Sequence, residues 1–208
     1  MNILILGPTG GTGQQLVRQA LEQNHTITAL ARTPEKLSLK HDRLAVIKGD
    51  VLDEDLLNKL VPNNDAILSA LGVTKSWKSD GLITKAVGLI AKLMSVHNVK
   101  RLILVSAFGA GDSIEQANPI QKFIFRVPLR SRYDDKTRSE EILKKFDLDW
   151  TVIYPVLLTN GPHTRRYRVG EKMDMKGMAT ISRADVADFA LRELNENSFV
   201  RKFPIIRY

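Results

Sequence analysis

The chain has 208 residues, and 43% of them are hydrophobic, which suits a single domain with a sizeable core. It has no cysteine, so neither a disulfide framework nor thiolate chemistry is expected, and its four histidines show no metal-ligand spacing. No apolar run reaches the roughly 18 residues of a membrane span, and no basic leader precedes the first apolar segment. We therefore expect a cytoplasmic protein without a metal site.

The formal net charge of +8 raises nucleic acid as a partner, because lysine and arginine neutralise phosphates. The basic residues are spread along the chain, however, with local clusters only at residues 126–132 and 165–172. No helix-turn-helix, zinc-finger or RNA-binding signature accompanies them. We expect a basic surface that attracts a small anionic ligand, with neither nucleic acid nor a membrane as partner, on a monomer or small homo-oligomer.

Strands and helices alternate along most of the chain. Apolar segments predict strands at residues 2–6, 26–31, 44–48, 66–70, 102–106, 151–154 and 203–206. Helical patterns lie at residues 13–23, 53–60, 82–97, 136–146 and 183–194. Several strands are continuous apolar runs, which is typical of a parallel sheet buried on both faces. The sequence predicts an α/β fold: one Rossmann-type domain over residues 1–208, with a doubly wound, mainly parallel sheet and helices on both faces.

The first strand runs directly into Gly7-Pro-Thr-Gly10-Gly-Thr-Gly13, and a helix follows at once. In this arrangement the backbone N–H groups that open the helix point at an anion. Gly7 permits the turn, Gly10 lets a pyrophosphate approach the backbone, and Gly13 allows close packing of helix on strand. Because the spacing differs from the commoner GxGxxG, the strand–helix context carries the prediction of a dinucleotide site; the alternative is a glycine-rich turn without a ligand.

The end of the second strand selects between NAD and NADP in such folds. Here the strand ends at Arg32, no Asp or Glu occupies its tip, and Lys36 follows four residues later. A guanidinium suits a 2′-phosphate and gains little from a diol, so the sequence favours NADP(H). The alternative is that Arg32 is an ordinary surface residue.

Residues at the ends of the third and fourth strands are also candidates for contact with the cofactor. Asp50 can accept a hydrogen bond from the adenine amino group while Val51 packs on the ring, or Asp50 can cap the next helix, for which Asp53 offers the better cap. The small residues that end the fourth strand, Ser69-Ala-Leu-Gly72, would let a ribose lie against the backbone.

Two irregular stretches, residues 108–133 and 155–178, leave the carboxyl ends of strands, where open α/β sheets bind ligands. Loops near 107–133 and 155–178 are therefore expected to wall a substrate site. Their aromatic residues would give a flat acceptor an apolar surface, and their arginines would attract its negative groups: Phe108, Phe123, Phe125 and Tyr167, with Arg126, Arg130, Arg132, Arg165 and Arg166.

Blocks of sequence along nearly the whole chain carry a family pattern: Gly7-Pro-Thr-Gly-Gly-Thr-Gly13, Ala31-Arg32, Lys48-Gly-Asp-Val-Leu52, Leu71-Gly72, Val105-Ser-Ala-Phe108, Tyr133-Asp-Asp-Lys-Thr-Arg138, Leu148-Asp-Trp-Thr151 and Ile181-Ser-Arg-Ala-Asp-Val186. In these the chain resembles the atypical short-chain dehydrogenases/reductases with NAD(P)-binding, NmrA-like domains. Within that group it is most similar to the biliverdin-IXβ and NADPH-dependent flavin reductases.

The resemblance implies a set of cofactor-binding residues. The pyrophosphate would lie on Gly7, Thr9, Gly10, Gly11, Thr12 and Gly13, the 2′-phosphate on Arg32 and Lys36, and adenine on Asp50 and Val51. Towards the nicotinamide it implies Leu71, Gly72, Ser106, Pro155, Val156 and Leu157. Lys136 falls where the flavin reductase-like proteins carry a histidine, and a lysine there can bond a ribose hydroxyl.

The resemblance leaves the chemistry open. Many short-chain dehydrogenases use Tyr-x-x-x-Lys, whereas here Lys136 follows Tyr133 one residue early; an offset of three still places the two on neighbouring helix faces. The resembled reductases instead pass hydride to a flavin such as FMN or to a tetrapyrrole, whose conjugation disperses the charge. Ser106 is the candidate catalytic residue, and a strand-end cap is its alternative role.

The sequence therefore leaves three candidate functions. The favoured one is an NADPH-dependent reductase of a flavin or similar flat, anionic, conjugated acceptor. A non-enzymatic NADP(H)-binding redox sensor of the NmrA type is the second, because the Tyr-x-x-x-Lys motif is missing. An epimerase-like enzyme acting on a nucleotide sugar is the third, and it needs that motif and a larger substrate domain.

Overall fold

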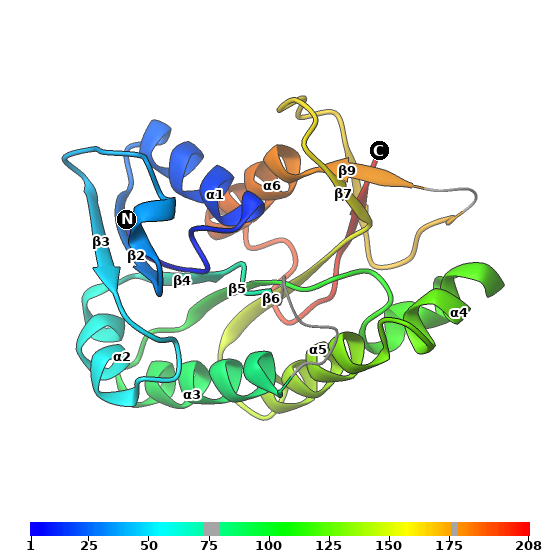
Figure 1. Cartoon of the computed structure of the whole chain (residues 1–208), viewed down its shortest axis with the longest axis horizontal. Helices are drawn as coiled ribbons and strands as arrows, with labels where there is room; N and C mark the ends of the chain where they lie inside the picture. The colour runs from blue at the N-terminus through cyan, green and yellow to red at the C-terminus, as the bar shows by residue number, and fades with distance from the viewer. Residues whose placement is uncertain (73–79, 176–178) are drawn as a thin grey trace.

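The computed structural model describes residues 1–72, 80–175 and 179–208. Within them eight strands form one sheet in the order β3-β2-β1-β4-β5-β6-β10-β8, and β7 pairs with β9 beside it (Figure 1). The strands are β1 Asn2–Leu6, β2 Thr26–Ala31, β3 Leu44–Lys48, β4 Ala66–Ser69, β5 Arg101–Val105, β6 Asp149–Pro155, β7 Leu157–Thr159, β8 Arg168–Gly170, β9 Thr180–Ser182 and β10 Ile205–Arg207. All pairs in the large sheet are parallel except β10 with β8, so the predicted fold class is confirmed.

The chain order reverses at the centre of the sheet. From β1 the chain builds outward through β2 to β3, then returns to place β4 on the other side of β1. Open α/β sheets bind ligands in the crevice beyond the carboxyl ends of the strands at such a reversal. The topology therefore predicts a binding crevice at the carboxyl ends of β1 and β4.

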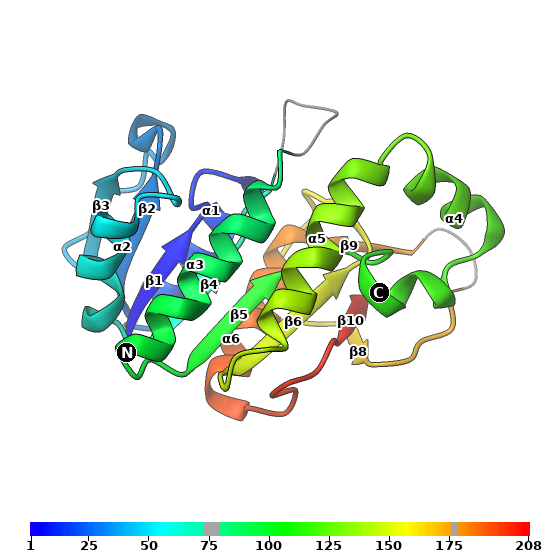
Figure 2. The same cartoon turned by 90° about the horizontal axis from the view of Figure 1, so that it is seen from below.

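Helices cover both faces of the sheet (Figures 1 and 2). The helices α1 (Gly11–Glu22) and α6 (Arg183–Glu196) pack together on one face, and α2 (Glu54–Leu60), α3 (Leu82–Val96) and α5 (Arg130–Leu143) cover the other. The short helix α4 (Pro119–Arg126) lies at the end of α5 away from α3 (Figure 2). This is the layered arrangement that strand–helix–strand alternation predicts.

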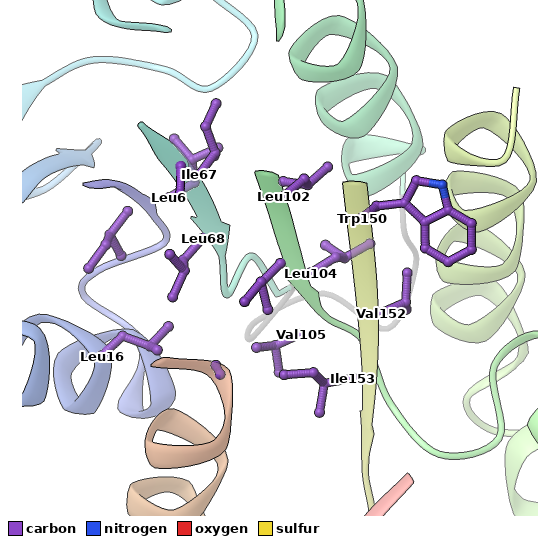
Figure 3. Close-up of a cluster of buried hydrophobic side chains, with 14 of the residues drawn as sticks. Leu6, Leu16, Ile67, Leu68, Leu102, Leu104, Val105, Trp150, Val152 and Ile153 are labelled. Atoms are coloured by element: carbon purple, nitrogen blue, oxygen red, sulfur yellow. The ribbon is translucent and has the colours of Figure 1, made fainter. Parts of the chain in front are cut away.

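The core lies between the sheet and both helical layers. Side chains of β1, β4, β5 and β6 gather there with Leu16 of α1 (Figure 3). The four residues Ile3–Leu6 are fully buried, as the continuous apolar run predicts for a central parallel strand. Trp150 at the start of β6 packs at the side of the sheet covered by α5 (Figure 3).

The turn between β1 and α1 is set by two close approaches. Gly7 has a φ of +76°, and a Cβ there would lie 2.8 Å from the carbonyl oxygen of Ala70. A Cβ on Gly13 would lie only 2.0 Å from the carbonyl oxygen of Gly7. Both positions thus need glycine, as expected for a tight turn with the helix packed onto it.

The predicted irregular stretch at residues 108–133 is wrong in most of its length. It contains a 3₁₀ turn at Gly111–Gln116, helix α4 and the first turn of α5. Asn118 and Gln121 form a capping box that starts α4, a signal already present in the sequence. Helix α5 begins at Arg130 and not at residue 136, because its polar first turns are held by tertiary contacts: Tyr133 stacks on Phe125, and Asp135 accepts hydrogen bonds from α3.

The second predicted irregular stretch, residues 155–178, contains the short strands β7 and β8. Each has three residues, too few for a periodic pattern to be recognised. Residues 176–178 of this prediction lie outside the described part of the chain.

We expect Gly13→Ala to destabilise the fold by about 1–3 kcal/mol or more, because the new methyl group meets backbone that cannot move aside. Gly10→Ala is the matched control: its Cβ would lie 3.6 Å from the Gly7 carbonyl oxygen, an ordinary contact. Urea unfolding of both variants measures the difference. Equal unfolding midpoints would contradict the account of the turn.

Candidate functional site

A cavity of about 530 Å³ opens at the carboxyl ends of the central strands. Its walls come from the glycine turn, the ends of β2, β3, β4 and β5, the first turn of α3 and the first half of α5. Of the predicted cofactor-binding residues it brings together Gly7, Thr9, Gly10, Gly11, Thr12, Arg32, Lys36, Asp50, Val51, Leu71, Gly72, Ser106 and Lys136. Thus segments far apart in sequence meet at the topological reversal.

The N-terminus of α1 faces this cavity without a side-chain cap. Its N-cap residue is Gly10, and its first turn carries no acidic side chain. In contrast, Asp53, Asn118 and Ser182 cap α2, α4 and α6 with their own side chains. Uncapped amides and the positive end of the helix dipole together favour an anion at this place.

Arg32 and Lys36 stand at one end of the cavity, beyond the tip of β2. Lys36 belongs to a 3₁₀ turn at Pro34–Lys36, and both side chains are exposed. Within the described part of the chain neither side chain makes a hydrogen bond or an ion pair. Two unpaired cations next to uncapped amides extend the anion-binding surface.

Asp50 and Val51 follow β3 and lie on the same wall. One carboxylate oxygen of Asp50 accepts a hydrogen bond of 2.9 Å from the Leu52 amide, which shapes the turn. Asp53 accepts from the Leu56 amide and caps α2, so the better cap expected from the sequence is confirmed. The other carboxylate oxygen of Asp50 has no hydrogen bond within the described residues, so it is available for a ligand.

Ser106 lies at the end of β5 with Glu140 directly behind it. The Ser106 hydroxyl donates a 2.6 Å hydrogen bond to Oε1 of Glu140, and the Tyr154 hydroxyl donates one of 2.7 Å to Oε2. Glu140 is almost fully buried, and burial raises the pKa of its carboxyl, although the two hydroxyls and Lys136 oppose that shift. Sequence reasoning missed Glu140; its spacing of four from Lys136 on a helix was the available signal.

Tyr133 and Lys136 both line the cavity from α5. Burial raises the pKa of the Tyr133 phenol to about 12. Burial lowers the pKa of Lys136 to about 8, while the carboxylates of Glu140 and Asp135 oppose that shift. In the described residues the Lys136 ammonium has no hydrogen bond and no ion pair within 4 Å. A phenol whose pKa is raised is a poor general acid, so the usual tyrosine chemistry is disfavoured.

The aromatic wall expected from the sequence is wrong. None of Phe108, Phe123, Phe125 and Tyr167 lines the cavity. Phe108 is buried edge-on against Phe125, Phe123 is 65% exposed on α4, and Tyr167 donates to Asp188 of α6. The apolar lining comes instead from aliphatic residues: Leu82, Ile83, Leu129 and Leu158.

Of the five arginines expected near the acceptor, Arg132 alone lines the cavity within the described residues. Arg165 is paired with Asp188 on α6, and Arg130 with Asp134. Arg183, which sequence reasoning missed, lies against the glycine turn: a Cβ on Gly11 would be 2.7 Å from its Cδ. It begins α6, and no local pattern relates that helix to the turn at residue 11.

Four predicted cofactor-binding residues lie off the cavity wall. Gly13 sits beneath the turn, where its role is the close contact with Gly7. Pro155 and Val156 are buried where β6 pairs with β10, and the exposed Leu157 begins β7. Their neighbour Leu158 reaches the wall instead. Contact of these residues with a cofactor stays a prediction.

The described residues hold no cluster of three or more histidines and acidic side chains that would suit a metal ion. Among those same residues, no helix is both long and apolar enough to cross a membrane.

Comparison with solved structures places the fold among known proteins. The anaerobillin reductase ChuY from Escherichia coli O157:H7 superposes with a TM-score of 0.81 at 21% identity, over 99% of this chain and 96% of that one. A short-chain dehydrogenase/reductase from Veillonella parvula, solved in complex with NADP, superposes with a TM-score of 0.80 at 23% identity, over 99% and 93%. At these identities the likeness shows a shared fold.

Among curated proteins, the photosystem II assembly factor Ycf39 of a Synechocystis strain is 27% identical to the chain over 222 aligned positions. The alignment covers 99% of the chain but 62% of that relative, so the chain spans less than two thirds of its length. A family model described as NAD(P)H-binding matches residues 7–197, which include the glycine turn and every segment that lines the cavity. The chain belongs to this NAD(P)H-binding family.

Proposed function

We propose that the protein is an NADPH-dependent reductase that transfers hydride to a flat, conjugated, anionic acceptor such as a flavin or a linear tetrapyrrole. The observation that carries the proposal is one cavity that holds uncapped helix amides and three cations, Arg32, Lys36 and Lys136, which have no ion pair within residues 1–72, 80–175 and 179–208. Unpaired charge in a concave site favours a ligand with several phosphates.

The positions of the cations support NADP(H) over NAD(H). The amides of Gly11 and Thr12 would hold the diphosphate, and Arg32 with Lys36 would hold a further phosphate beyond the end of β2. No acidic side chain of the kind that binds a ribose diol ends that strand. The Veillonella relative bound to NADP has the same fold.

When bound, the dinucleotide would supply the hydride, and residues of the chain would position the cofactor and the acceptor and make polar contacts with them. Lys136 and Ser106 lie on the wall where they would orient the polar groups of cofactor and acceptor. Leu82, Ile83, Leu129 and Leu158 would exclude water around the reacting atoms, and Arg132 would attract an acidic group of the acceptor. Such a site relies on positioning rather than on a strong side-chain acid.

The Ycf39 relative is a photosystem II assembly factor, so a non-catalytic protein that senses NADP(H) is the second candidate. The raised pKa of Tyr133 also fits that candidate, because it removes the usual proton donor. The two functions differ in turnover: a sensor binds NADPH and oxidises it no faster than buffer does.

Arg32→Asp should raise the Kd for NADPH by about 10- to 100-fold, because a charge-assisted hydrogen bond contributes about 1.5–3 kcal/mol. The Kd for NADH should be unchanged or lower, since a carboxylate suits the ribose diol. Fluorescence titration measures both constants. An unaltered NADPH affinity would remove Arg32 from the binding site.

The affinity for NADPH should fall as the pH rises through about 8, by up to about tenfold per pH unit above it. Lys136 is charged below its lowered pKa and neutral above it, so its attraction for an anion is lost on the alkaline side. Lys136→Met should make the Kd independent of pH over this window, whereas Lys36→Met should weaken binding and keep the dependence. A pH-independent Kd in the wild type would contradict this role.

Steady NADPH oxidation should exceed background with FMN or biliverdin as acceptor, and Arg132→Glu should raise the KM for that acceptor. Arg166→Glu is the matched control, because it makes the same change in net charge away from the cavity wall. A wild type without turnover on any acceptor supports the sensor. Equal KM values in the two variants would show long-range steering alone.

A further inference from the structure

A second cavity of about 580 Å³ lies between the end of β6 and the 3₁₀ turn at Gly111–Gln116. Tyr154 and Phe203 form its inner wall, and exposed residues, among them Asp112, Glu115 and Glu171, carry it to the solvent. It shares no lining residue with the first cavity among the described residues. Between the two stands the carboxyl group of Glu140.

The hydrogen bonds described above connect the two cavities. Ser106 lines the first cavity and bonds one oxygen of Glu140, and Tyr154 lines the second and bonds the other. The space is confined by Gly111, where a Cβ would lie 2.5 Å from Oε2 of Glu140 and 2.6 Å from the Tyr154 hydroxyl. Three oxygen-bearing groups therefore form one continuous chain, and position 111 beside it has no room for a side chain.

We propose that Ser106, Glu140 and Tyr154 form a proton relay that carries protons from solvent in the second cavity to the acceptor in the first. The inference rests on the proposed reductase function, which consumes one proton for each hydride transferred. Ser106 contacts the acceptor side, and Glu140 and Tyr154 act through it. The relay is a property of this site beyond cofactor binding.

The direction of the bonds explains how the relay would work. When Glu140 is ionised, both hydroxyls donate to it and the Ser106 hydrogen points away from the first cavity. When Glu140 is neutral, its own hydrogen can bond to Oγ of Ser106, and the serine hydrogen is then free to face the acceptor. Burial favours this neutral form by raising the pKa of Glu140.

Each transfer breaks one O–H bond and forms another. In one concerted shift the acceptor takes the proton of Ser106, Ser106 takes that of Glu140 and Glu140 takes that of Tyr154. Tyr154 takes a proton from solvent in the second cavity at the same moment, so that no phenolate forms. No electrons move along the relay, because the electron pair reaches the acceptor with the hydride. Burial and Glu140 raise the pKa of Tyr154, so its phenol holds the proton between transfers.

The charged groups around the relay include Lys136 on the helix of Glu140 and Lys144 at the C-cap of that helix, and both favour the ionised form of Glu140. Asp112, which faces Tyr154 from the 3₁₀ turn, raises the pKa of that phenol further. Whether Glu140 is neutral at working pH is therefore the first point to measure.

Infrared spectroscopy of the ligand-free protein measures directly whether the Glu140 carboxyl group is neutral. The wild type should show the carbonyl band of a neutral carboxylic acid at neutral pH, and Glu140→Gln should lack that band. Glutamine keeps the shape, and its Oε1 can accept from one hydroxyl while its Nε2 donates to the other, so loss of folding does not produce the difference. Absence of the band from the wild type would overturn the relay and leave the proposed reductase function intact.

Measurements of kcat test whether protons follow this relay. With the faster of FMN and biliverdin as acceptor, Tyr154→Phe and Glu140→Gln should each lower kcat about tenfold or more and change the solvent isotope effect, at an unchanged Kd for NADPH. Tyr167→Phe is the matched control, because it removes a phenol–carboxylate bond of 2.6 Å to Asp188 away from the cavity and should keep the wild-type kcat. Wild-type kcat and isotope effect in Tyr154→Phe would overturn the relay. Absence of turnover in the wild type would overturn the function and the relay together.

Discussion

The contact between Gly13 and the Gly7 carbonyl is the constraint on which the binding site depends. It seats α1 directly on the end of β1, so that the first amides of the helix open into the crevice between β1 and β4. A side chain at either glycine would move the helix and with it the positive end of its dipole. The same contact belongs to the core and to the site, so stability and binding are coupled here.

Ion pairing of the basic side chains differs between the cavity wall and other parts of the described chain. Arg32, Lys36 and Lys136 on the cavity wall have no ion pair among the described residues. Cations elsewhere, such as Arg165 and Arg101, are paired with Asp188 and Glu193. An unpaired cation that lines a concave site lowers the free energy of a bound anion without the cost of breaking an existing ion pair. This contrast within one chain supports a polyanionic ligand more strongly than the net charge of +8 does.

Much of the fold could be predicted from the sequence, because the central strands are continuous apolar runs and the first three match their predicted bounds. Helix α4 was missed although Asn118-Pro-Ile-Gln121 is a capping box, because its apolar residues were interpreted as a ligand surface. The start of α5 could not be found locally: its polar first turns are ordered by Phe125 and by the N-terminus of α3, which are distant in sequence.

The residues of the candidate site likewise divide into those that the sequence could predict and those that it could not. Residues that follow strands, such as Arg32, Asp50 and Ser106, could be predicted because strand ends converge at one edge of a parallel sheet. Leu158 and Arg183 reach the site through tertiary packing, and nothing in their own sequence surroundings indicates it. Glu140 was missed although it lies four residues after Lys136 on the same helix. The expected aromatic wall is not part of the cavity, because the aromatic residues make other contacts: Phe108 packs on Phe125, and Tyr167 donates to Asp188 of α6.

We expect the α1 amides and Arg32 together to hold one phosphorylated dinucleotide. A crystal structure of the protein grown with NADPH tests it most directly. The account predicts the diphosphate against the amides of Gly11 and Thr12 and the 2′-phosphate against Arg32 and Lys36. A crevice without NADPH, or a dinucleotide whose 2′-phosphate lies away from Arg32, would contradict it.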